Sequence, residues 1–248
     1  ELVENGEHKN LFFMGPVYQM QSLLFRRIFK IFIFEIVVLV VLITAYLVNY
    51  EFENNTQLLT YSTKRGRELI IDKLYTSILE SVIVVTIVIL TVLTTYFSVF
   101  DYSGLWDVPI SSALMAEGNI IYMSWWNISF VQFLFFAIGL VYICALIFTG
   151  ITFIISKFVR NSYIVFFIFI MIFGIGLFPS IAPKSSNSIF ISGFTPFFLV
   201  VNPHVWFMES GAFTTFKYYE LITIVIWSVM AILLSLFCIR GFKRQDIF

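Results

Sequence analysis

The sequence has few charged residues. Lysine, arginine, aspartate and glutamate make up 12% of its 248 residues, and 15 basic residues balance 15 acidic ones. A soluble globular domain carries about a quarter charged residues, and nucleic-acid-binding domains carry a basic excess. The composition therefore argues against a soluble domain and against nucleic acid as a partner.

Cysteine and histidine are equally scarce, at two residues each. Cys144 and Cys238 lie inside apolar runs, which favours small buried side chains over a disulfide or a metal pair. The chain contains no HExxH, GxSxG or GxxxxGK[ST] motif. We therefore expect no catalytic, cofactor-binding or metal-binding residues in it, and no nucleotide hydrolysis by the chain itself.

Apolar residues are abundant and occur in long runs. The chain is 60% hydrophobic and 19% aromatic, with a mean hydropathy of +0.94. About 20 consecutive apolar residues span a bilayer as a helix. The sequence predicts an all-α, polytopic membrane protein with a transmembrane domain over residues 29–248, and its spans are expected at 29–50, 78–99, 128–156, 163–182 and 219–239.

Basic residues in short loops set the orientation, because they stay in the cytoplasm. With five alternating spans, two basic residues fall on one side, Lys184 and Lys217. Nine fall on the other side: Lys64, Arg65, Arg67, Lys73, Lys157, Arg160, Arg240, Lys243 and Arg244. This imbalance predicts a multi-pass protein of the cell membrane, with the 51–77 loop and the C-terminus in the cytoplasm.

Residues 1–28 do not fit this count. The alternation places them outside the cell, yet they contain Lys9, Arg26 and Arg27. A preceding span would carry the segment outward before these charges could bias it. We therefore expect an extracytoplasmic segment over 1–28, and a sixth span upstream of it.

The two outer connections are too apolar for ordinary solvated loops. Residues 100–127 contain Trp106, Trp125 and Trp126, which are typical membrane-interface anchors. Residues 183–218 are divided by prolines into short apolar pieces. Pieces of that length cannot span a membrane, so they indicate re-entrant or interfacial half-helices at the outer mouth of a pathway.

Two carboxylates lie within the expected spans. Glu35 is about two turns into the first span, where an ionisable residue is a functional hypothesis by default. The structural alternative is that it reaches the outer interface or pairs with Lys30. Glu80 begins the second span, where a carboxylate suits a helix N-terminus, so anchoring competes with a proton-relay role.

The segment "YSTKRGRELIIDKLYTS", residues 61–77, is a charged island between two apolar runs. After Gly66, the residues Leu69, Ile70, Lys73 and Ser77 follow helical spacing, while Glu68 and Asp72 fall on another face. The pattern predicts an amphipathic cytoplasmic helix that runs into the next span. Simple interfacial anchoring and docking of a cytoplasmic protein both account for it.

The stretch "EFENNTQLLTYSTKRGRELIIDKLYTS" resembles the cytoplasmic segment of type-2 ABC exporter permeases. The matching positions are Glu51 or Glu53, the Leu58–Leu59 pair, the Ser/Thr-Lys-Arg-Gly-Arg run and Lys73. "GLWDVPISSA", "SWWNISFVQFLFF" and "RGFKRQ" are also similar to this family. The resemblance implies six spans, a dimer with a second permease copy or a homologue, and separate cytoplasmic ATPase subunits that carry ATP and Mg²⁺.

This resemblance predicts the transmembrane subunit of an exporter that moves an amphipathic, peptide-like or lipid-like cargo outward. The expected ATPase-coupling residues are Ser62, Lys64, Arg65, Gly66, Arg67, Glu68, Asp72 and Lys73. The main alternative is an ATP-independent secondary transporter or channel that uses Glu35. An intramembrane enzyme lacks a catalytic motif in this sequence, and a non-transporting scaffold remains a further alternative.

Overall fold

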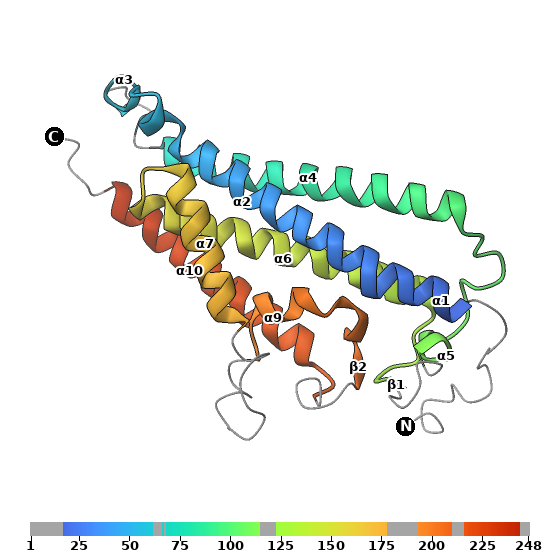
Figure 1. Ribbon diagram of the computed structural model, residues 1–248. Coiled ribbons are helices and arrows are strands. Elements are labelled where there is room, and N and C mark those ends of the chain that lie inside the picture. The colour runs from blue at the N-terminus through green and yellow to red at the C-terminus, as the bar shows by residue number, and fades with distance from the viewer. Residues whose placement is uncertain are drawn as a thin grey trace.

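The computed structural model describes residues 17–61, 66, 68–114, 123–177, 193–209 and 216–243, and the structural statements below concern these residues. Four long helices form the body: α2 (Phe29–Glu53), α4 (Leu69–Val99), α6 (Phe130–Phe158) and α10 (Tyr219–Lys243) (Figure 1). All four belong to helical segments long and apolar enough to cross a membrane. The predicted all-α polytopic architecture is confirmed at this level.

The expected fifth span is shorter than the others. Helix α7 covers Ser162–Gly176, which is 15 residues, and only Leu177 follows it before the described part is interrupted. At 1.5 Å per residue this helix is roughly 22 Å long, against about 30 Å of hydrocarbon. The structure therefore supports four spans and leaves the predicted span at 163–182 as a short apolar helix.

The helix of the first span begins well before residue 29. Helix α1 (Val17–Ser22), the π-helical segment η2 (Leu23–Ile28) and α2 follow one another without a break. Residues 17–28 of the predicted N-terminal segment therefore continue the spanning helix. The side chains of Leu24 and Phe25 in η2 are buried in the core.

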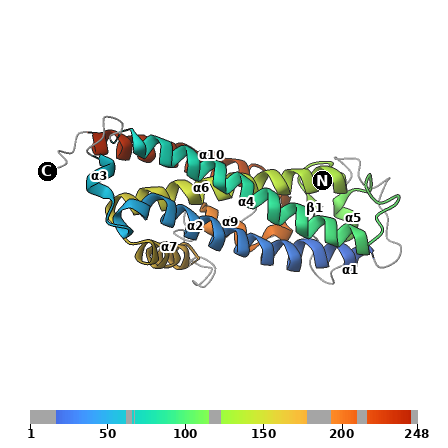
Figure 2. The same ribbon diagram turned by 90° about the horizontal axis from the view of Figure 1, so that it is seen from above.

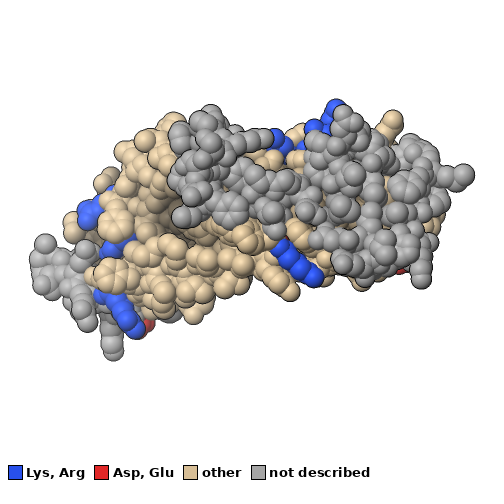
Figure 3. Space-filling view, turned by 90° about the horizontal axis from the view of Figure 1, so that it is seen from below, with Lys and Arg blue, Asp and Glu red and all other residues tan. Residues whose placement is uncertain are grey.

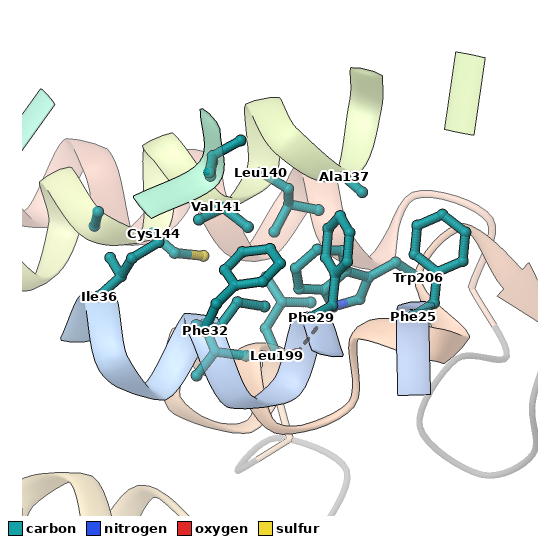
Figure 4. Close-up of a cluster of buried hydrophobic side chains, with 14 of the residues drawn as sticks. Phe25, Phe29, Phe32, Ile36, Ala137, Leu140, Val141, Cys144, Leu199 and Trp206 are labelled. Atoms are coloured by element: carbon teal, nitrogen blue, oxygen red, sulfur yellow. Dashed lines mark hydrogen bonds between the residues drawn. The ribbon is translucent and has the colours of Figure 1, made fainter. Parts of the chain in front are cut away.

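Helix α2 lies at the centre of the bundle, between α4, α6 and α7. Figure 4 shows Phe25 of η2, with Phe29 and Phe32 of α2, pointing toward α6. Ala137, Leu140, Val141 and Cys144 meet them there. Cys144 and Cys238 are both buried free thiols, as predicted.

The connections that precede α6 and α10 meet in a small cap at one end of the bundle. It contains five short elements: α5 (Ile110–Leu114), β1 (Met123–Ser124), α9 (Pro196–Val201), η4 (Pro203–Val205) and β2 (Met208–Glu209). Strands β1 and β2 pair antiparallel, which joins the two connections directly (Figure 1). Trp206 is fully buried in the cap and donates from Nε1 to the carbonyl of Leu199 at 2.9 Å.

Side-chain caps fix where α6, α7 and α9 begin. Ser129 and Gln132 form a reciprocal capping box at the start of α6. Asn161 accepts a hydrogen bond from the Ile164 N–H at the start of α7, and Thr195 accepts one from the Phe198 N–H at the start of α9.

Candidate functional site

A buried ion pair joins α2 to α4 at the end of the bundle that the charge count assigns to the cytoplasm. The Lys73 ammonium contacts the Glu51 carboxylate and also donates to the carbonyl of Val48. The two side chains are only 8% and 13% exposed. Lys73 was expected on a surface that a partner contacts, but its charge is already balanced inside the protein.

The helical spacing around Lys73 was correct, but its packing was not foreseen. Ile70, Lys73 and Ser77 share the face of α4 that is buried, while Glu68 is exposed before the helix begins. Helix α4 begins at Leu69 and continues without a break to Val99, so residues 69–77 run directly into the spanning part of the helix. Asp72 lies in the first turn of α4, where the positive end of the helix dipole stabilises a carboxylate.

Two consecutive asparagines end α2. Asn55 adopts a left-handed conformation with φ of 57°, which asparagine tolerates better than most residues. The Thr56 N–H then bonds the carbonyl of Glu51 at 2.9 Å, and the Asn55 N–H bonds that of Phe52 at 3.4 Å. This is a Schellman motif, and it redirects the chain away from the bundle.

The redirected chain forms α3 (Gln57–Tyr61), which projects beyond the bundle (Figure 1). Leu58 and Leu59 on this helix are each 75% exposed. Tyr61 closes the helix against the bundle, with its ring 5.5 Å from that of Phe242. Burial, with a smaller effect of the Glu51 charge, raises the pKa of the Tyr61 phenol to about 12.

Gly66 packs directly against the end of α3. A Cβ placed on Gly66 would lie 2.7 Å from the carbonyl oxygens of Thr60 and Tyr61 and from the Cα of Tyr61. These are backbone atoms, so they cannot move aside without shifting the helix. Gly66 lies shortly before the start of α4 at Leu69, and its close backbone approach to α3 is one that only glycine allows.

We expect Gly66→Ala to displace α3 and lower stability by about 1–3 kcal/mol, the usual cost of overpacking. Gly241→Ala is the matched control, because a Cβ there meets nothing within 4 Å. Thermal unfolding in detergent and protease sensitivity at α3 measure the two effects. Equal behaviour of the two variants contradicts the close packing at Gly66.

Cation–π contacts and a hydrogen bond connect α2, α6, α7 and α10 at the end of the bundle next to α3. The Arg160 guanidinium lies 4.8 Å from the Phe52 ring centre, and the Lys157 ammonium lies 4.3 Å from that of Phe242. The Glu53 carboxylate accepts the Ser162 N–H at 2.7 Å and so holds the start of α7. Helices α2, α6, α7 and α10 therefore meet in one network beside α3.

Some expected coupling residues fall outside the described part of the chain. These are Ser62, Lys64, Arg65 and Arg67. Leu58 and Leu59, which the resemblance matched but which were not among the expected site residues, are strongly exposed at this end of the structure, as are Phe158 at the end of α6 and Tyr163 at the start of α7. A pair of leucines after a helix stop at Asn54–Asn55 is the signal from which they could have been recognised.

Glu80 lies inside the bundle and meets α2. Its Oε2 accepts a hydrogen bond from Thr44 at 3.5 Å, while its Oε1 is buried and has no partner within the described part of the protein. Ser81, on the next position of α4, contacts the Thr149 hydroxyl of α6. The half of the α2–α4–α6 interface nearer to α3 thus contains polar side chains.

Glu35 behaves differently, because it is exposed on the outer face of α2. No hydrogen bond or ion pair joins it to Lys30 or to another described residue. The predicted pairing with Lys30 is therefore not seen. The two carboxylates named from the sequence lie on different faces of the protein and do not form one site.

Two apolar grooves run along α6 and α10. One has a volume of about 450 Å³ and is also lined by Leu74 and Ile78 of α4. The other has a volume of about 370 Å³ and reaches Phe207 and Glu220 beside the cap. Ile143 lines both grooves, so they adjoin. Figure 3 shows a largely uncharged surface over the described part of one face, with scattered basic side chains.

Metal ligands are not gathered anywhere in the described ranges: no group of three or more histidine, cysteine, aspartate or glutamate residues is found there. The arrangement is that of a membrane bundle with a projecting apolar helix at one end and a compact cap at the other.

Comparison of the chain with family models, with curated proteins and with solved structures gives no match.

Proposed function

We propose that this chain is the membrane subunit of an ATP-driven exporter and that a separate cytoplasmic ATPase acts on it through α3. The single observation that carries the proposal is the exposed Leu58–Leu59 pair on a helix that projects beyond the membrane bundle. Exposed leucines in water are unfavourable unless another surface covers them. The resemblance of residues 51–77 to exporter permeases suggests that the covering surface belongs to the ATPase.

The connections of α3 suit it to transmit movement. The Schellman motif joins it rigidly to α2, and Gly66 packs its other end against the segment that leads to α4. The Lys73–Glu51 pair then holds α2 and α4 together just inside the bundle. A displacement of α3 would therefore move both α2 and α4.

The rest of the proposal follows the resemblance. We infer a protein of the cell membrane with its C-terminus in the cytoplasm, α7 as a fifth membrane helix, and the cap as the outer half-helical region. A second permease copy or a homologue completes the transporter. The apolar grooves along α6 and α10 suit an amphipathic, peptide-like or lipid-like cargo.

The test is co-purification with the ATPase after Leu58→Glu and Leu59→Glu are introduced together. We expect ATPase recovery and ATP-dependent export to fall at least tenfold, because a desolvated contact would receive two charges. Gln57→Glu on the same helix adds charge without removing apolar area and is the matched control. Full ATPase recovery with the double variant refutes docking at α3.

Export that persists without any ATPase would instead support the ATP-independent alternative. Glu35→Gln distinguishes the two, since it abolishes transport that is coupled to protonation of Glu35. In the ATP-driven exporter the same variant retains ATP-dependent export. The measurement is cargo efflux with and without a proton gradient.

A further inference from the structure

The outward face of α2 carries a carboxylate within an apolar stripe. Ile31, Phe34 and Val38 are 68%, 36% and 42% exposed, and Glu35 is exposed between them. Their spacing of three and four residues places these four side chains on one face of the helix. This face looks away from the packed core that Figure 4 shows.

Glu35 lies inside the Gln19–Glu53 helix, which is long and apolar enough to cross a membrane. It is five residues, or roughly 7.5 Å along the helix axis, inside Lys30, and the apolar part of α2 continues beyond it for several turns. A charged side chain left in hydrocarbon at the bilayer centre lowers the equilibrium constant for membrane insertion by up to about a hundredfold. A residue of this kind is normally covered by protein or water and given a partner.

An apolar groove lies next to the stripe of α2 that contains Glu35, although Glu35 itself does not line it. Phe34 and Val38 of α2 also line a groove with Phe169, Ile170 and Phe173 of α7, with a volume of about 170 Å³. Figure 2 shows α7 beside one part of α2. Exposed side chains of α7, including Phe167 and Met171, continue the apolar surface. We name this surface, with Glu35 at its edge, the α2–α7 face.

We propose that the α2–α7 face binds a membrane-spanning helix of a partner subunit that carries a lysine or arginine at the depth of Glu35. Acyl chains can fill the groove, but they offer nothing to a carboxylate. A helix can place apolar side chains in the groove and a cation beside Glu35. This inference goes beyond the proposed function and does not depend on ATP-driven transport.

In a symmetric dimer of this chain, the nearest described cation on α2 is Lys30, which lies roughly 7.5 Å along the helix axis from Glu35. A two-fold axis along the membrane normal sets each element at the same depth in both copies. Around Glu35, the exposed described residues of α2 and α7 are apolar, whereas Lys30 lies near the start of α2 and Arg26 and Arg27 lie before it in η2. A self-interface would therefore place Glu35 against apolar groups or another Glu35.

The test is photo-crosslinking in membranes of the native cell, with p-benzoylphenylalanine in place of Phe34. The matched control carries the same group in place of Phe237, which is 75% exposed on α10. We expect Phe34 alone to give an adduct with one protein, mapped by mass spectrometry to a spanning helix with a lysine or arginine within one turn of the crosslink.

Charge exchange then decides whether Glu35 is recognised. Glu35→Lys should reduce the adduct at least tenfold at equal membrane levels, and reversing the partner's cation should restore it. Glu35→Leu should insert at least as well as the parent protein and still give less adduct, which separates recognition from misfolding. Adducts with a second copy, adducts with lipid alone, or indifference to Glu35→Lys would each overturn the proposal.

Discussion

Lys73→Met is expected to destabilise the protein by about 3–5 kcal/mol, because it leaves the Glu51 carboxylate buried without its cation. Glu51 is only 13% exposed, so water cannot readily replace the lost ammonium. The carbonyl of Val48 loses its donor as well. Thermal unfolding in detergent should show the midpoint lowered by roughly 10 °C.

The double variant Lys73→Met with Glu51→Met separates the ion pair from the packing. Replacing both charges with apolar side chains of similar length is commonly neutral or stabilising, so we expect it to recover most of the loss. Lys217→Met is the surface control, since Lys217 is exposed, and it should change stability by less than about 0.5 kcal/mol. A double variant as unstable as the single one contradicts the pairing.

The same double variant tests the coupling role first assigned to Lys73. If it folds normally and keeps ATPase-dependent export, the pair serves the structure alone. If it folds normally and loses export, the charges take part in passing movement from α3 to the spans. Stability and export therefore have to be measured on the same preparation.

The long helices could be predicted from the sequence because bilayer thickness imposes a strong constraint. A run of apolar residues either reaches across about 30 Å or does not, and α2, α4, α6 and α10 all include predicted runs. The run at 163–182 met the same criterion, yet α7 ends at Gly176. Composition alone does not show where a helix stops inside an apolar run.

Packing partners were harder to predict than helix faces. Periodicity correctly grouped Ile70, Lys73 and Ser77, but it does not say whether such a face meets a partner or the next helix. The decisive contact is Glu51, which lies 22 residues earlier on another helix. A charged side chain at a helix end is compatible with either contact, to a partner protein or to another helix, until the position of the neighbouring helix is known.

Short elements left no periodic signal to find. Helix α3 has five residues and each cap strand has two, which is less than the window over which periodicity is detected. Their positions depend on specific contacts such as Gly66 against Thr60 and the pairing of Met123 with Glu209. The prolines correctly indicated broken structure before α10, but not its pairing with the loop before α6.

Glu220→Ala is expected to loosen the cap. The buried Glu220 carboxylate accepts the Phe207 N–H at 2.7 Å. Phe207 has a φ of 61°, which is unusual for a bulky residue and costs on the order of 1–3 kcal/mol unless the surroundings enforce it. Removing the acceptor leaves this amide unpaired, and we expect a loss of about 2–4 kcal/mol.

The loosening should be local, since the Phe207 carbonyl in turn accepts hydrogen bonds from the Trp125 N–H and the Ser124 hydroxyl. Hydrogen exchange should therefore rise in β1 and β2 while the cores of α2 and α6 stay protected. Glu220→Gln keeps an oxygen acceptor and should lose less than about 1.5 kcal/mol, and Glu68→Ala, at an exposed position, should not alter the cap. Because Phe207 and Glu220 also line the groove along α6 and α10, a loosened cap opens the end of that groove beside it. Unchanged exchange in β1 and β2 after Glu220→Ala would show that the cap is held by its buried rings alone.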